Sequence, residues 1–115
     1  MADKSKPEVW TGERCFISEL INDNDWPAFS LARCRVEPGV TTQLHALSVL
    51  EFYVVERGRG RMRVGDDAPF DIGPGDTVTI PQHAAQSVTN TGDTDLVFLC
   101  LCTPRFLQDC YTSLE

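Results

Sequence analysis

The sequence predicts an all-β protein, a sandwich or a barrel, formed by a single domain. Eight or more short runs of apolar, β-branched and aromatic residues follow one another closely, and glycine, proline, asparagine and aspartate separate them. Almost no stretch has the period of an amphipathic helix. A chain of 115 residues is long enough for one hydrophobic core but not for two.

The strands of this barrel are expected between residues 13 and 103. Residues 1–12 are polar and interrupted by proline and glycine, which predicts a flexible N-terminal arm or a short edge segment. Turn residues then delimit a series of candidate strands, which cover residues 14–21, 28–36, 44–56, 61–64, 70–72, 77–81, 84–90 and 96–104. Residues 96–104 are the most apolar run, so we expect a central strand there.

The C-terminal tail, residues 104–115, is expected to pack on the barrel. Its apolar residues are Phe106, Leu107, Cys110, Tyr111 and Leu114. Their spacing fits a short amphipathic helical turn, and an extended segment packed by its aromatic side chains fits nearly as well.

The charge balance and the hydropathy pattern disfavour several classes of function. The chain carries 17 acidic and 10 basic residues, a net charge of −7, whereas binding to nucleic-acid phosphates requires a basic surface. No apolar run is long enough to span a bilayer, and the first residues lack the apolar core of a signal peptide. We therefore expect a cytoplasmic protein with no nucleic-acid partner and no membrane association.

The five cysteines do not predict a disulfide framework, because their number is odd and their spacing is irregular. Cys100 and Cys102 are two residues apart, which places both side chains on one face of a strand. Paired thiols can bind a metal ion, but no second cysteine or histidine pair lies nearby in the sequence. We interpret these two residues as small apolar core residues.

The stretch from residue 39 to residue 58 contains the polar residues that could form a site. Strand alternation places one set of its side chains on a single face if no bulge intervenes. This set is His45, Leu47, Val49, Glu51, Tyr53 and Val55. A glutamate that faces the interior of a barrel would be desolvated, which raises its pKa unless hydrogen-bond donors or a cation compensate.

The same stretch resembles the first sequence motif of the cupin family, and a later stretch resembles the second. The residues that stand at the intervals of the two motifs are Gly39, His45, Glu51, Gly58, Gly75, Pro81 and Asn90. The resemblance covers residues 28–102 and implies a cupin double-stranded β-helix, or jelly-roll barrel. The pattern is also similar to that of small bacterial single-domain cupins whose tail reads Thr-Pro-Arg-Phe, as residues 103–106 do here.

Three positions depart from the family pattern. In metal-binding cupins three histidines and the glutamate hold the ion, and only His45 and Glu51 match them. Leu47 replaces the second histidine and Gln86 the third, while His83 stands where the second motif has a glycine. The resemblance therefore implies a degenerate metal site of His45, Glu51 and Gln86. Such a site would hold Mn, Fe or Zn weakly, because an amide is a poorer ligand than an imidazole.

Without a metal ion, the same face predicts an acid–base site. His45, Glu51 and Tyr53 could move a proton next to a carbonyl group, as in metal-free isomerases or epimerases. A third alternative is a non-catalytic binding or sensing pocket, in which a hydrogen-bonded cluster of His45, Glu51 and Gln86 shapes the cavity. His83 by itself is interpreted as a surface histidine. In every case we expect a small-molecule ligand, and the resemblance implies a homodimer.

Overall fold

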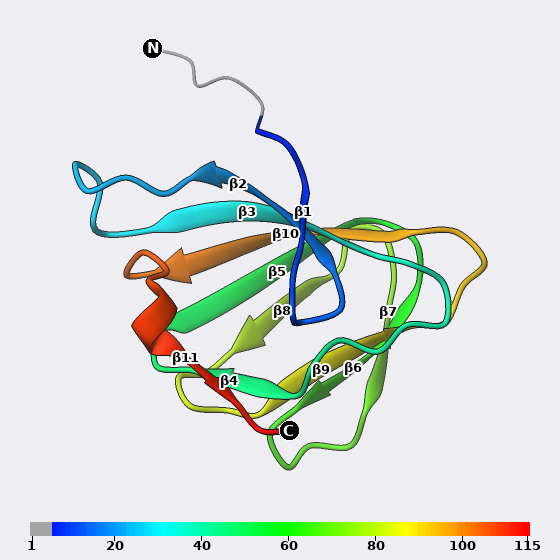
Figure 1. Ribbon diagram of the computed structural model, residues 1–115. Helices are drawn as coiled ribbons and strands as arrows, with labels where there is room; N and C mark the ends of the chain where they lie inside the picture. Colours follow the sequence, from blue (N-terminus) through cyan, green and yellow to red (C-terminus); the bar gives the residue numbers. More distant parts are fainter. Residues whose placement is uncertain (1–5) are drawn as a thin grey trace.

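Two antiparallel β-sheets that face each other make up the computed structural model, which describes residues 6–115 (Figure 1). The six-stranded sheet contains, in spatial order, β1 (Val9–Trp10), β2 (Phe16–Ile21), β3 (Ser30–Val36), β10 (Leu96–Thr103), β5 (Leu50–Arg57) and β8 (Thr77–Ile80). The five-stranded sheet contains β11 (Tyr111–Ser113), β4 (His45–Leu47), β9 (Gln86–Asn90), β6 (Gly60–Val64) and β7 (Phe70–Ile72). The prediction of an all-β fold is confirmed. Among the described residues the only helix is the short 3-10 turn η1 (Gln108–Cys110), and none is long and apolar enough to cross a membrane.

Strand β10 lies in the middle of the six-stranded sheet, between β3 and β5, as its apolar sequence predicts. On the β5 side, Cys102 is opposite Glu51 and Cys100 is opposite Tyr53. On the β3 side, Phe98 of β10 is opposite Cys34. These pairings bring together segments that are far apart in the sequence, so the spacing of residues along the chain does not reveal them.

The sequence predicts a single strand over residues 44–56, and this prediction is wrong. This run divides at Ser48 and Val49, where the chain passes from β4 in one sheet to β5 in the other. The alternation of inward-facing and outward-facing side chains nevertheless continues across this corner. The buried residues of the run are His45, Leu47, Val49, Glu51, Tyr53 and Val55. The predicted inward face is confirmed, and its side chains line both walls of the interior.

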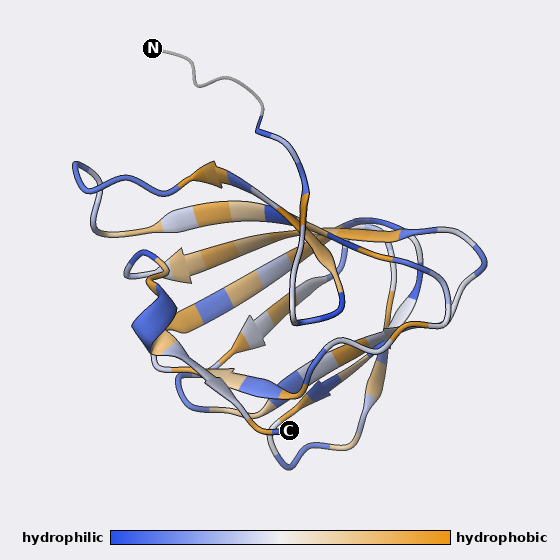
Figure 2. Cartoon of the chain, in the orientation of Figure 1, coloured by the Kyte–Doolittle hydropathy of each residue, from blue (hydrophilic) through white to orange (hydrophobic). Residues whose placement is uncertain are grey.

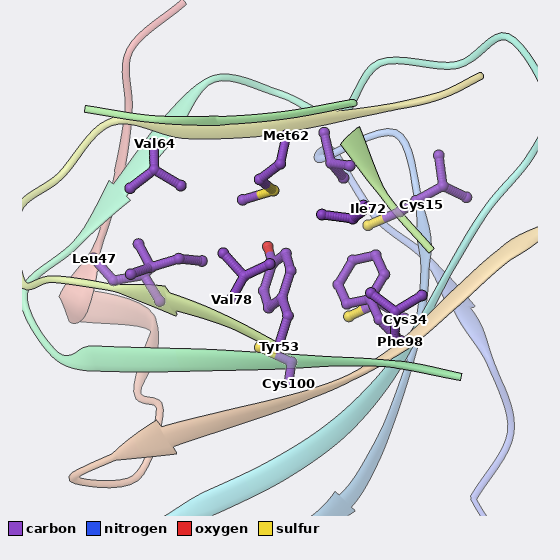
Figure 3. Packing of buried hydrophobic residues seen from close by; sticks show 14 of the residues in the cluster. Cys15, Cys34, Leu47, Tyr53, Met62, Val64, Ile72, Val78, Phe98 and Cys100 are labelled. Atoms are coloured by element: carbon purple, nitrogen blue, oxygen red, sulfur yellow. The ribbon is translucent and has the colours of Figure 1, made fainter. Parts of the chain in front are cut away.

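Apolar side chains fill the space between the two sheets. Figure 2 shows the alternation of hydrophobic and hydrophilic residues along the strands. In β6, for example, Met62 is fully buried, whereas Arg61 faces outward and pairs with Asp71 at 3.0 Å. Met62 and Tyr53 reach toward each other from opposite sheets in Figure 3, and the ring of Tyr53 stacks on Phe98 with centroids 4.2 Å apart.

The first strand, β1, and the C-terminal tail both pack on the body of the barrel. The flexible arm predicted for residues 1–12 falls partly on residues 1–5, which lie outside the described residues, while β1 pairs with β2 as an edge strand. The two interpretations of the tail are each partly right, because η1 is a helical turn and β11 is extended along β4. An ion pair between Arg14 and Glu115, at 2.8 Å, ties the segment before β2 to the end of the tail.

The turn between β5 and β6 requires a glycine. Gly58 has a φ of 86°, a conformation that residues with a side chain rarely adopt. A Cβ atom at this position would come within 2.4 Å of the carbonyl oxygen of Asp95. This glycine of the first motif therefore permits the close approach of two backbone segments.

Candidate functional site

A cavity of ≈ 580 Å³ lies between the sheets, with a wall formed by residues of β1 to β5, β10 and the C-terminal tail. This volume is within the range of small-molecule sites. Much of the wall is apolar, with side chains such as Ile17, Leu47 and Phe98. The barrel thus encloses a space in which a few polar groups face an apolar surround.

A chain of three buried side chains links Tyr53 to Glu51 through Gln86. The Tyr53 hydroxyl donates to Gln86 Oε1 at 2.8 Å, and Gln86 Nε2 donates to Glu51 Oε1 at 2.6 Å. Strand β5 places Glu51 and Tyr53 on the same face, and β9 begins with Gln86 directly opposite His45 of β4. Both ends of the Gln86 amide are therefore engaged within the protein.

The second carboxylate oxygen of Glu51 faces two thiols of β10. Cys100 Sγ donates to Glu51 Oε2, and Cys102 Sγ lies 3.8 Å from the same oxygen. Burial raises the pKa of Glu51 above its ordinary value of 4.5, while hydrogen bonds from Cys100 and Gln86 oppose the increase. Burial also raises the pKa of Tyr53 well above its ordinary value, so the hydroxyl keeps its proton.

His45 lies on the opposite wall, and two of its side-chain neighbours, Glu13 and Tyr111, come from near the two ends of the chain. Its Nδ1 donates to the backbone carbonyl of Gln43 at 2.7 Å, since a carbonyl oxygen can only accept, and this leaves Nε2 facing Glu13 Oε1 at 3.6 Å. The ring stacks on Tyr111 with centroids 4.9 Å apart. Burial raises the pKa of the Glu13 carboxyl, and the neighbouring imidazole opposes that increase.

The structure thus brings together only part of the predicted site. Glu51, Gln86 and Tyr53 form one cluster, but the side-chain neighbour of His45 is Glu13 rather than Glu51. Sequence reasoning did not single out Glu13 as a site residue. No local pattern marks this residue, because its place at the cavity depends on how the N-terminal segment folds against β4.

The two β10 cysteines have a further contact that the sequence interpretation missed. Cys100 and Cys102 are buried, as predicted for small core residues, but both also face the Glu51 carboxylate. Their spacing, which places both side chains on one face of a strand, could have indicated a shared contact. The sequence did not reveal the register that places β10 beside β5, and so it did not reveal that this contact is Glu51.

The departures from the family motifs have clear places in the fold. Leu47 is buried in the cavity wall. His83 is exposed in the turn between β8 and β9, as predicted for a surface histidine, and has a φ of 68°. That left-handed conformation accounts for the glycine that the family pattern has at this position.

The residues at the family's ligand positions do not fit a shared metal ion as they lie. Leu47 offers no donor atom, both ends of the Gln86 amide are hydrogen-bonded, and His45 faces Glu13. Every buried side-chain nitrogen and oxygen atom within residues 6–115 has a hydrogen-bond partner, so an ion at the family positions would have to displace existing hydrogen bonds. Weak metal binding by His45, Glu51 and Gln86 therefore stays a prediction.

Two facing antiparallel sheets around a cavity with buried polar side chains define a small jelly-roll barrel. The profile of the cupin domain family matches residues 32–102. The chain belongs to the cupin family.

Individual relatives agree with this assignment. An uncharacterised protein of Methanocaldococcus jannaschii is 33% identical over 116 residues, which cover 98% of this chain and 91% of the relative. Oxalate decarboxylase from Bacillus subtilis superposes with a TM-score of 0.79 at 24% identity, over 94% of this chain but only 30% of that chain. An uncharacterised conserved protein with a double-stranded β-helix domain from Klebsiella pneumoniae superposes with a TM-score of 0.77 at 13% identity, over 91% of this chain and 88% of that chain. At these identities the two solved structures show the shared fold alone.

Proposed function

We propose that the protein binds a small, uncharged polar molecule in the cavity between its sheets. The observation that carries this proposal is the cavity of ≈ 580 Å³, whose apolar wall contains a few polar groups that can orient a ligand. Glu51 on one wall, and the His45–Glu13 contact on the other, offer donors and acceptors for hydroxyl and carbonyl groups.

The charges around the cavity favour a neutral ligand over an anion. Glu13, Glu19 and Glu51 line it, whereas Lys6 is the only lysine or arginine among the described residues of its wall. A carboxylate ligand would meet like charges and no arginine that could hold it by two hydrogen bonds. Oxalate decarboxylases share the fold, but a dianion such as oxalate does not suit this lining.

A thermal-shift screen tests the proposal with neutral sugars, polyols, aldehydes and ketones beside sugar acids and keto acids of similar size. We expect neutral compounds to raise the melting temperature, because a ligand that binds only the folded state stabilises it. Glu13→Gln should change the affinity, whereas Glu56→Gln, whose partner is Arg33 on the outer surface, should not. A screen in which only the acids raise the melting temperature would contradict the proposal.

A second candidate function is acid–base isomerisation of a bound carbonyl compound. The contact of His45 Nε2 with Glu13 Oε1 at 3.6 Å favours it, because an imidazole beside a carboxyl can remove a proton from a ligand and return it. Glu51 and Tyr53 line the facing wall, where the Tyr53 hydroxyl could redirect its hydrogen bond from Gln86 to the carbonyl oxygen of the ligand. The test is deuterium exchange into the ligand in D2O, followed by NMR. Exchange that is equal in the parent and in Glu13→Gln would exclude this role.

The prediction of a weak metal site at the family positions is tested by elemental analysis of the purified protein and of His45→Ala and Glu51→Ala. We expect Leu47→His combined with Gln86→His to raise the affinity for Mn, Fe or Zn sharply, because two imidazoles then replace an apolar group and an amide. No gain would mean that these positions do not face one cavity. The expected homodimer is tested by light scattering against the chain mass of 12.8 kDa.

A further inference from the structure

The Glu51 carboxylate and the thiols of Cys100 and Cys102 form a compact cluster in the cavity wall. One ligand atom from each residue lies within 4.8 Å of the other two, and Cys102 Sγ is 3.8 Å from Glu51 Oε2. The register explains the cluster, since Cys102 is directly opposite Glu51 and Cys100 lies on the same face of β10. Within residues 6–115 this is the one group of three histidine, cysteine or acidic side chains at metal-ligand spacing.

A third thiol adjoins the cluster from the neighbouring strand. Cys34 is directly opposite Phe98 of β10, which is two residues before Cys100 on the same face of the strand. Cys34 belongs to β3, on the side of β10 away from β5. Figure 3 shows Cys34 and Cys100 on neighbouring segments in the interior, near Phe98 and Tyr53. The sulfur-rich surface therefore extends across two adjacent strands, β3 and β10, and Glu51 of β5 adjoins it.

The cluster faces the cavity, and a hydrogen bond from Gln86 fixes the orientation of its carboxylate. Glu51, Cys34, Cys100 and Cys102 all line the cavity, so an ion can reach them and water can complete its coordination. Gln86 donates to Glu51 Oε1 at 2.6 Å, which leaves Oε2 directed at the thiols. Hydrogen bonds of this kind orient carboxylate ligands in metal sites.

We propose that Glu51, Cys100 and Cys102 bind a divalent, thiophilic cation of the zinc class. In a tetrahedral zinc site, ligand atoms at about 2.0–2.3 Å from the metal lie about 3.3–3.8 Å from one another. The Cys102–Glu51 separation of 3.8 Å is at the upper end of this range, and the shorter Cys100–Glu51 contact has to lengthen when the ion replaces the thiol proton. On binding, each coordinating thiol loses its proton to solvent and Glu51 binds as the carboxylate. Cys34 or a water molecule supplies the fourth ligand. This site does not use His45, and it does not require a small-molecule ligand in the cavity.

Cobalt serves as the spectroscopic probe. The full-length protein is reduced, stripped with a chelator that is then removed, and titrated with Co²⁺ followed by Zn²⁺. We expect a thiolate-to-cobalt charge-transfer band that saturates at one ion per chain and disappears when Zn²⁺ is added. The melting temperature should rise with each metal. Cys100→Ser and Cys102→Ser should each weaken Co²⁺ binding at least tenfold.

The matched control is Cys110→Ser, which replaces a buried cysteine that does not line the cavity and should leave the band unchanged. Circular dichroism establishes that each variant is folded, and Cys100→Ala and Cys102→Ala replace any serine variant that is not. The proposal is overturned if the parent gives no thiolate band, or if the band survives both β10 substitutions. Metal binding that His45→Ala abolishes and the cysteine variants retain would also overturn it. Running the thermal-shift ligand screen with a chelator present makes failure of the metal site and failure of ligand binding distinguishable.

Discussion

Replacing Gln86 by leucine removes the central member of the hydrogen-bonded chain between Tyr53 and Glu51 while keeping a side chain of similar size. Gln86 is 0% exposed, and its amide bonds the Tyr53 hydroxyl and Glu51 Oε1. No other hydrogen bond of these two partner atoms is present within residues 6–115. The substitution therefore leaves one buried hydroxyl and one buried carboxylate oxygen without a partner.

The size of the effect follows from these two orphaned groups. A buried polar group that loses its partner costs about 1–3 kcal/mol, so we expect Gln86→Leu to lower the free energy of unfolding by about 2–6 kcal/mol. Tyr53→Phe alone removes the only donor to Gln86 Oε1, so it should cost about 1–3 kcal/mol. In the Gln86→Leu background the same change removes an orphaned hydroxyl, and it should then be neutral or stabilising.

Urea denaturation of the parent, the two single variants and the double variant gives a double-mutant cycle. We expect a coupling energy of about 1 kcal/mol or more between positions 53 and 86, because the two side chains share a hydrogen bond. Gln108→Leu is the control, since Gln108 is exposed and its replacement should change stability by about 0.5 kcal/mol or less. A Gln86→Leu variant as stable as this control, with no coupling to position 53, would refute the network.

Two further predictions concern the turn after β5 and the C-terminal tail. Gly58→Ala should cost about 2–4 kcal/mol in urea denaturation, because it combines a left-handed φ with a backbone clash. Gly39→Ala, which has a φ of 77° but open space, should cost about 1–2 kcal/mol, and Gly12→Ala should be nearly neutral; equal costs at all three positions would contradict this reasoning. Hydrogen bonds from Arg14 and from the Leu44 backbone lower the pKa of Glu115 from 4.5 to about 2, so its contribution to stability is present above pH 4.5 and lost as the pH falls toward 2. Glu115→Gln should therefore lower the melting temperature at neutral pH, and its difference from the parent should shrink between pH 4.5 and 2; a difference that does not change with pH would speak against the Arg14 pair.

The sequence predicted those features that depend on neighbours in the chain. Strand alternation is local, and it correctly placed His45, Glu51 and Tyr53 on the inward face even though the chain changes sheets between them. The motif glycines also reflect local structure, since the backbone conformation of a single turn requires Gly58. Together these patterns were sufficient for the family and the barrel.

The features that were missed depend on contacts between distant segments. Glu13 meets His45 only because the segment before β2 folds over β4, and the thiol of Cys102 meets Glu51 only because β10 pairs with β5. Neither register nor the path of a terminal segment is encoded in spacing along the chain. The prediction that His45 and Glu51 act as partners was made from their shared face, and the corner at Ser48 and Val49 places them on different sheets instead.

Alkylation of the unpaired, buried cysteines can also report local opening of the protein. All five are free and buried in the folded state, and they are distributed over the N-terminal segment, β3, β10 and η1. An alkylating reagent can modify Cys110, which does not line the cavity, only when the tail that covers it opens, whereas it can reach the other four thiols through the cavity. Site-by-site alkylation rates, read by mass spectrometry, would therefore separate opening of the tail from entry into the cavity.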